Sequence, residues 1–216
     1  MAQGYTDRRH AGRVLADEVA ARVGLDPGVV VLALPRGGVP VAHEVAQRLG
    51  APLDVLVVRK LGVPGHEELA MGAIASGGST IVDHGLARRL GIADDDLASV
   101  IAVEQRELAR REATYRGGRP APDLAGRTVV LVDDGLATGS TMRAAVEAVR
   151  SGGPRRVVVA VPVGAPQACD AMQGIADEVV CPLAPSGFTA VGYWYDDFSQ
   201  TGDDEVQALL FERSGG

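Results

Sequence analysis

VVLVDDGLATGSTM, residues 129–142, is the stretch that decides the fold. Its first four residues are branched and apolar, which predicts a strand buried on both faces of a sheet. Asp133 and Asp134 follow directly, and a loop of small residues then leads into a helical pattern. The amides and the dipole at a helix start attract an anion, whereas paired carboxylates accept hydrogen bonds from hydroxyls or face a hard cation. The stretch therefore predicts a sugar-phosphate site.

Two other interpretations of this loop compete with that prediction. A Walker A loop requires a lysine after its last glycine, and none follows Gly139, so that interpretation fails. A plain strand-to-helix turn with an acidic end is the remaining alternative, and the segment by itself leaves it open.

The bulk composition bounds the class of protein. A chain of 216 residues can bury one full core, and 46% hydrophobic content without a long apolar run predicts a soluble protein with no membrane partner. A net charge of −7 argues against a nucleic-acid partner. Cys169 and Cys181 form no C-x-x-C pair, and residues 1–13 do not form a signal peptide, so we expect free thiols and a cytoplasmic protein. Lys60 is the only lysine among 21 basic residues.

Hydrophobic periodicity predicts alternating helices and strands. We expect helices over about 7–23 (capped by Thr6), 39–49, 94–115, 142–149 and 167–174, and strands over 29–34, 53–58, 71–75, 80–82, 129–132, 157–161 and 178–181. Gly77-Gly78 predicts a hairpin turn, and residues 61–69 are expected to form a mobile loop in which His66, Glu67 and Glu68 have no assigned role. This alternation indicates an α/β fold with a mostly parallel sheet and helices on both faces.

Three of the predicted strand ends carry special chemistry. They are Pro35-Arg36-Gly37-Gly38, Arg59-Lys60 and Asp133-Asp134. Since ligands of such sheets bind at the carboxyl ends of the strands, we expect these three segments to form one site.

The 129–142 stretch resembles the phosphoribosyl pyrophosphate (PRPP) motif of type I phosphoribosyltransferases. The resemblance covers roughly residues 29–197 and implies Mg²⁺-dependent transfer of ribose 5-phosphate from PRPP to a nitrogenous base, with release of pyrophosphate. It implies that Asp133 and Asp134 hold the 2′- and 3′-hydroxyls of the ribose. The 5-phosphate would be fixed by the loop residues Ala137, Thr138, Gly139, Ser140 and Thr141.

Two further segments extend the resemblance to the pyrophosphate. Leu34-Pro35-Arg36-Gly37-Gly38 looks like the family's pyrophosphate loop, which implies a cis peptide bond between Pro35 and Arg36, close approach at Gly37 and Gly38, and a charged contact from Arg36. A βα turn with a helix-starting proline at Pro40 is the alternative. Arg59-Lys60 resembles the pair that contacts pyrophosphate in several members, with a solvated strand end as the alternative.

Residues 191–196, Val-Gly-Tyr-Trp-Tyr-Asp, look like a segment of the 6-oxopurine enzymes in which an aromatic residue covers the base and an aspartate approaches magnesium. Trp194 would then cover the base, and Asp196 would join Asp133 and Asp134 around the metal, partly through water or substrate. The chain departs from that pattern at Ala137, where those enzymes carry an aspartate, and over 161–165, which offers only backbone groups to a base. Within the PRPP motif itself, Gly135 stands where the family more often has an aliphatic residue, which is expected to loosen the turn without removing a ligand. The acceptor therefore stays unassigned.

These inferences combine into one prediction. The chain is a single phosphoribosyltransferase domain over 1–216, with a core over about 24–185, a flexible loop over about 60–83 and a hood over about 186–212 to which the N-terminal helix can contribute. Arg36, Lys60, Asp133 and Asp134 form the catalytic set. The alternative is a PRPP- or nucleotide-binding regulator of the same fold without turnover, and a homodimer stays open.

Overall fold

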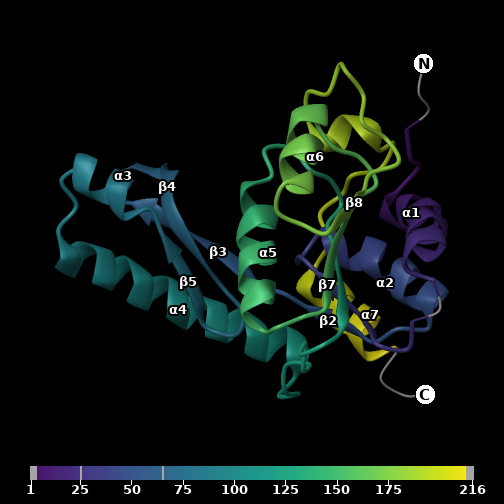
Figure 1. Ribbon diagram of the computed structural model, residues 1–216, viewed down its shortest axis with the longest axis horizontal. Coiled ribbons are helices and arrows are strands. Elements are labelled where there is room, and N and C mark those ends of the chain that lie inside the picture. The colour runs from purple at the N-terminus through teal and green to yellow at the C-terminus, as the bar shows by residue number, and fades with distance from the viewer. Residues whose placement is uncertain (1–3, 25, 65, 213–216) are drawn as a thin grey trace.

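The computed structural model describes residues 4–24, 26–64 and 66–212, apart from the side chains of Glu67 and Glu68, which lie outside the described part. Its central sheet has five parallel strands in the order β2-β1-β6-β7-β8 (Figure 1). The strands are β1 (Val29–Ala33), β2 (Leu53–Val55), β6 (Thr128–Val132), β7 (Arg156–Ala160) and β8 (Glu178–Val180). The predicted α/β class is confirmed.

Helices cover both faces of this sheet, because alternate residues of each strand point to opposite sides. Val29 and Val31 pack with α1 (Arg8–Val23), α2 (Gly38–Leu49) and α7 (Asp203–Phe211) in one cluster. Val30 and Leu32 pack with α5 (Ser140–Ser151) and α6 (Pro166–Gln173) in the other. Every residue of β1 and β6 is buried, as the apolar runs predict.

A second sheet projects from this core as an arm (Figure 1). It consists of the antiparallel strands β3 (Val58–Val63), β4 (His66–Ala75) and β5 (Ser79–Val82), followed by α3 (His84–Arg89) and α4 (Asp94–Arg116). The predicted hairpin across Gly77-Gly78 is confirmed, and so is the helix that opens at Asp94. The 23-residue α4 returns the chain from the arm to the core.

The expectation of a loop over 61–69 is wrong, because β3 and β4 pair across most of that segment. The expected single strand over 53–58 is also wrong. The chain leaves the core sheet after Val55 and enters the arm at Val58, so Arg59 and Lys60 lie inside β3 rather than at the end of a core strand.

The segment predicted as the hood lies against the N-terminus, and the name hood is kept for it below. A 3₁₀ turn, η1 (Val191–Trp194), precedes an extended stretch, and Tyr5 pairs with Tyr195 as an isolated parallel bridge. The α1 cap is Asp7 rather than the predicted Thr6, since the Asp7 carboxylate accepts the amide of His10 at 2.7 Å. Among the helices of the described ranges, none combines the length and the hydropathy that a membrane span needs.

Candidate phosphoribosyl site

The loop after β1 lies directly against the two aspartates that follow β6. The amide of Leu34 donates to the carbonyl of Val132 at 2.8 Å, which joins the two strand ends. A side chain at Gly38 would meet the Val132 carbonyl at 2.7 Å, and one at Gly37 would collide with the Asp134 carboxylate. The peptide bond between Pro35 and Arg36 is cis, as expected. Glycine is therefore required at 37 and 38 by space.

Burial sets the electrostatics of the aspartate pair. Burial and the neighbouring charge of Asp134 raise the pKa of Asp133 well above its usual value. Burial also raises the pKa of Asp134, while Arg8 opposes that rise. The amide of Asp134 donates to Asp133 Oδ1 at 2.9 Å. The pair thus forms a compact set of oxygen acceptors at the rim of the sheet.

Arg8, from the first turn of α1, is a site residue that the sequence did not reveal. Its Nε donates to Asp134 Oδ2 at 2.8 Å, and both side chains are less than one fifth exposed. The same guanidinium stacks 3.9 Å from the centre of the Phe198 ring and donates to the Ser199 carbonyl at 2.7 Å. Because 126 residues separate Arg8 from Asp134, no local pattern signals this contact.

The small-residue loop turns between β6 and α5 as predicted. Gly139 has φ 79°, a conformation that favours glycine, and α5 begins at the next residue. Leu136 anchors the loop through its amide to Val163 (2.9 Å) and its carbonyl to the amide of Ala165 (2.8 Å). Ala137, Thr138 and Ser140 are exposed, and Thr141 is half-buried. The loop thus presents its backbone and hydroxyls at a helix start, where an anion is favoured.

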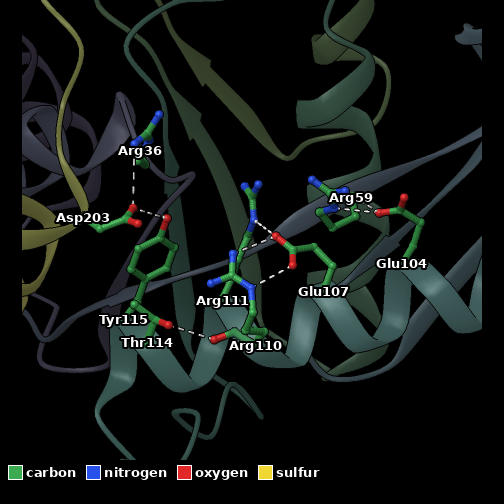
Figure 2. Close-up of polar contacts among 9 residues, drawn as sticks. All are labelled: Arg36, Arg59, Glu104, Glu107, Arg110, Arg111, Thr114, Tyr115 and Asp203. Carbon is green, nitrogen blue, oxygen red and sulfur yellow. Dashed lines mark hydrogen bonds and ion pairs between the residues drawn. The ribbon is translucent and has the colours of Figure 1, made fainter.

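Lys60 and Thr141 line the same cavity, of about 620 Å³, between the arm and the start of α5. Lys60 is exposed on β3. Arg59 also lines this cavity, but its Nε donates to the Glu104 carboxylate of α4 at 2.7 Å (Figure 2). Among the ion pairs of the described residues, Arg59 has one with α4 and Lys60 does not.

Trp194 and Asp196 lie in the hood, whose η1 segment packs against Gly135 through Val191. Trp194 is half-buried and its carbonyl accepts the amide of Tyr5, while the amide of Asp196 donates to the Tyr5 carbonyl and the Asp196 side chain is exposed. The hydroxyl of Tyr195 donates to the Asp134 carbonyl at 2.5 Å, so the hood contacts the aspartate pair through backbone.

The unusual Gly135 makes room for the hood. A Cβ at this position would lie 2.5 Å from Val191 Cγ1 and 2.7 Å from Val191 Cγ2. The space that a side chain would take at this position is thus filled by Val191.

The donor set fits a magnesium ion only as a partner of substrate. Within the described ranges, no three His, Cys, Asp or Glu side chains gather to hold a metal. Mg²⁺ commonly takes one or two carboxylates and completes its octahedron with water and phosphate oxygens. Asp133 and Asp134 can supply those two carboxylates, and a role for Asp196 stays a prediction.

Known proteins share this architecture. The family model for the phosphoribosyl transferase domain matches residues 16–193. Two Mycobacterium tuberculosis proteins, provisionally named phosphoribosyl transferases, are 50% identical over 209 residues, which is 95% of this chain and 46% of each relative. The chain thus spans about half the length of these curated relatives.

Other relatives agree. The crystal structure of TT1426 from Thermus thermophilus is 47% identical, with a TM-score of 0.85 over 99% of this chain and 100% of that one. The bifunctional protein PyrR of Chloroflexus aurantiacus is 37% identical over 138 residues, 58% of this chain and 65% of its own length. The aspartate pair, the glycine loop packed on it and the helix start beside it are thus set in a shared fold, and the chain belongs to the phosphoribosyl transferase domain family.

Proposed function

We propose that this protein transfers ribose 5-phosphate from PRPP to a nitrogenous acceptor and releases pyrophosphate in a Mg²⁺-dependent reaction. The observation that carries the proposal is the packing of the 35–38 loop against Asp133 and Asp134, beside the 137–141 loop that opens α5. One rim thus holds acceptors for a diol and donors for two phosphate groups.

Each segment has a distinct task in this proposal. Asp133 and Asp134 accept hydrogen bonds from the ribose 2′- and 3′-hydroxyls. The backbone and hydroxyls of 137–141 bind the 5-phosphate, and the backbone of the 35–38 loop approaches the pyrophosphate at Gly37, since the Gly38 amide already donates to the Leu34 carbonyl. Trp194 covers the acceptor from the hood.

The chemistry is electrostatic rather than covalent. As the bond from C1 to the pyrophosphate oxygen breaks, the ribose gains positive charge and the pyrophosphate gains negative charge. Lys60 stabilises the charge on the leaving group, and Arg36 can do so only after its guanidinium leaves Asp203. Mg²⁺, when bound, neutralises part of the pyrophosphate charge.

A regulator that binds PRPP without turnover is the second candidate. Two observations favour it. Asp134, which the proposal assigns to the ribose, is already ion-paired to Arg8. Ala137 also provides no proton partner for a base.

One experiment separates the two candidates. The full chain is incubated with PRPP, Mg²⁺ and a panel of purine, pyrimidine and pyridine bases while pyrophosphate is measured, and PRPP affinity is measured in parallel by calorimetry. Pyrophosphate release that depends on one base supports the transferase. PRPP binding without release on any base supports the regulator, and no PRPP binding contradicts both.

A further inference from the structure

A small pocket lined by arginines lies outside the aspartate pair. It has a volume of about 150 Å³ and forms where the loop after β1, the last turns of α4 and the start of α7 meet (Figure 2). Its lining residues are Arg36, Arg110, Arg111, Thr114, Tyr115 and Asp203. None of residues 133–141 lines it.

Two of its arginines are held in place from one side. Glu107, one turn earlier on α4, accepts Nε and Nη2 of Arg110 at 2.8 and 2.9 Å and Nε of Arg111 at 2.8 Å. Hydrogen bonds from these arginines lower the pKa of Glu107 to about 2, so it stays ionised. The anchoring leaves further N–H groups on each guanidinium and fixes their positions before any ligand arrives.

The third arginine comes from the predicted pyrophosphate loop. Arg36 Nη1 lies 3.8 Å from Asp203 Oδ1, a long ion pair, and the Arg36 side chain is 35% exposed. Asp203 Oδ1 also accepts the hydroxyl of Tyr115 at 2.9 Å. Three guanidinium groups and one carboxylate line the pocket, so its lining is net positive in a chain of charge −7.

We propose that this pocket binds a compact oxyanion, a phosphate or carboxylate group, that does not belong to PRPP. The volume suits one such group, and guanidinium forks match the geometry of its oxygens. Two sources share this chemistry: an acidic group carried by the acceptor, and a free anion that acts as an effector.

The direct test is a calorimetric titration with inorganic phosphate at low ionic strength. It uses the full chain, the double variant Arg110→Gln/Arg111→Gln, and Arg106→Gln as a control, because Arg106 is exposed on α4 and does not line the pocket. Exposed ion pairs on a helix contribute little to stability, so the double variant should fold, which thermal melting checks. Each titration is run without ligand and with saturating PRPP and Mg²⁺, which fill the phosphate-binding loops.

With PRPP present, we expect the parent and Arg106→Gln to retain one phosphate site and the double variant to bind at least tenfold more weakly. Equal phosphate affinity in the double variant and the parent would overturn the proposal. Loss of the site when PRPP is added would also overturn it, because the pocket would then hold the pyrophosphate of PRPP. If PRPP itself does not bind, the proposed function fails, and the titrations without ligand still test the pocket.

Paired acceptors identify the source of the oxyanion. Two pairs of bases serve: uracil with orotate, and nicotinamide with nicotinate. In each pair the second member carries a carboxylate that the first lacks. If only the acidic member of a pair competes with phosphate, and the double variant loses this competition, the pocket belongs to the acceptor. Phosphate binding that neither member disturbs assigns it to a free effector.

Discussion

Arg8 Nε donates to Asp134 Oδ2 at 2.8 Å, which links the first turn of α1 to the carboxylate that we assign to the ribose. Burial raises the pKa of Asp134 and the Arg8 guanidinium opposes this rise, so Arg8 favours the ionised acceptor. Arg8 is therefore a positioning residue in the proposed site.

Replacing Arg8 should move the pH dependence of PRPP binding. In Arg8→Gln the pKa of the Asp134 carboxyl should be higher than in the parent. As the pH is lowered, the affinity for PRPP with Mg²⁺ should therefore begin to fall at a higher pH than in the parent. We expect a loss of about tenfold, or ~1.4 kcal/mol, on the acid side. Calorimetry between pH 5 and 8 measures it. Arg9→Gln is the control, since Arg9 pairs with Glu44 and not with the site; coinciding profiles for all three proteins would contradict the role of Arg8.

Asp133→Asn should stabilise the ligand-free protein while weakening PRPP binding. The raised pKa of Asp133 means that its ionisation costs stability, a cost that grows as pH rises above the range of an unfolded aspartate. Asparagine avoids this cost and keeps the acceptor for the Asp134 amide. We expect a gain of about 1 kcal/mol, or roughly 2–4 °C in Tm, that increases with pH.

Asp134→Asn serves as the comparison, because it leaves the Arg8 guanidinium without its carboxylate and should not gain stability. Both variants should bind PRPP about 1.5–3 kcal/mol more weakly, the range for hydrogen bonds to charged groups. Parental PRPP affinity in both would refute the assignment of the aspartates to the ribose.

Lys60 should matter for turnover more than for folding. It is exposed and shares a cavity with Thr141, so Lys60→Ala should leave Tm unchanged and lower kcat by on the order of 10²-fold if Lys60 stabilises the leaving group. Lys60→Arg should recover only part of the rate, because the guanidinium imposes its own geometry. Steady-state kinetics with the acceptor found by the panel measure this, and a parental rate in Lys60→Ala would make Lys60 a solvated strand residue.

Gly135→Ala should detach the hood from the aspartate pair. The added methyl would lie 2.5 Å from Val191 Cγ1, and such overpacking costs about 1–3 kcal/mol. Denaturant unfolding should show this loss, and Val191→Ala should restore most of it in the double variant. A loss that is simply additive would show that the two sites do not touch.

The core of the fold was predictable because its signals are local. The run of branched apolar residues at 129–132 predicts a buried strand. The glycines at 37 and 38 lie within a few residues of the strand that they follow, so their place at its end is also a local signal. The first part of the arm, residues 58–69, was not, since Gly62 and Pro64 favour a turn and only the pairing of β3 with β4 makes the segment a strand. The place of Arg8 in the site was not predictable either, because its contact with Asp134 joins residues that are 126 positions apart. By contrast, α7 has a local signal, because Val206, Leu209 and Leu210 lie at helical spacing.

The long helix α4 fixes the distance between the arm and the core. Glu104 holds Arg59 on β3, and Arg116, twelve residues later, bonds the buried Asp54 of β2 at 3.0 Å. At about 1.5 Å per residue these attachments lie roughly 18 Å apart along one rigid element. The arm therefore cannot fold over a ligand like a free loop: closing would require α4 to pivot at its Arg116 end, where the same motion would widen or narrow the arginine pocket.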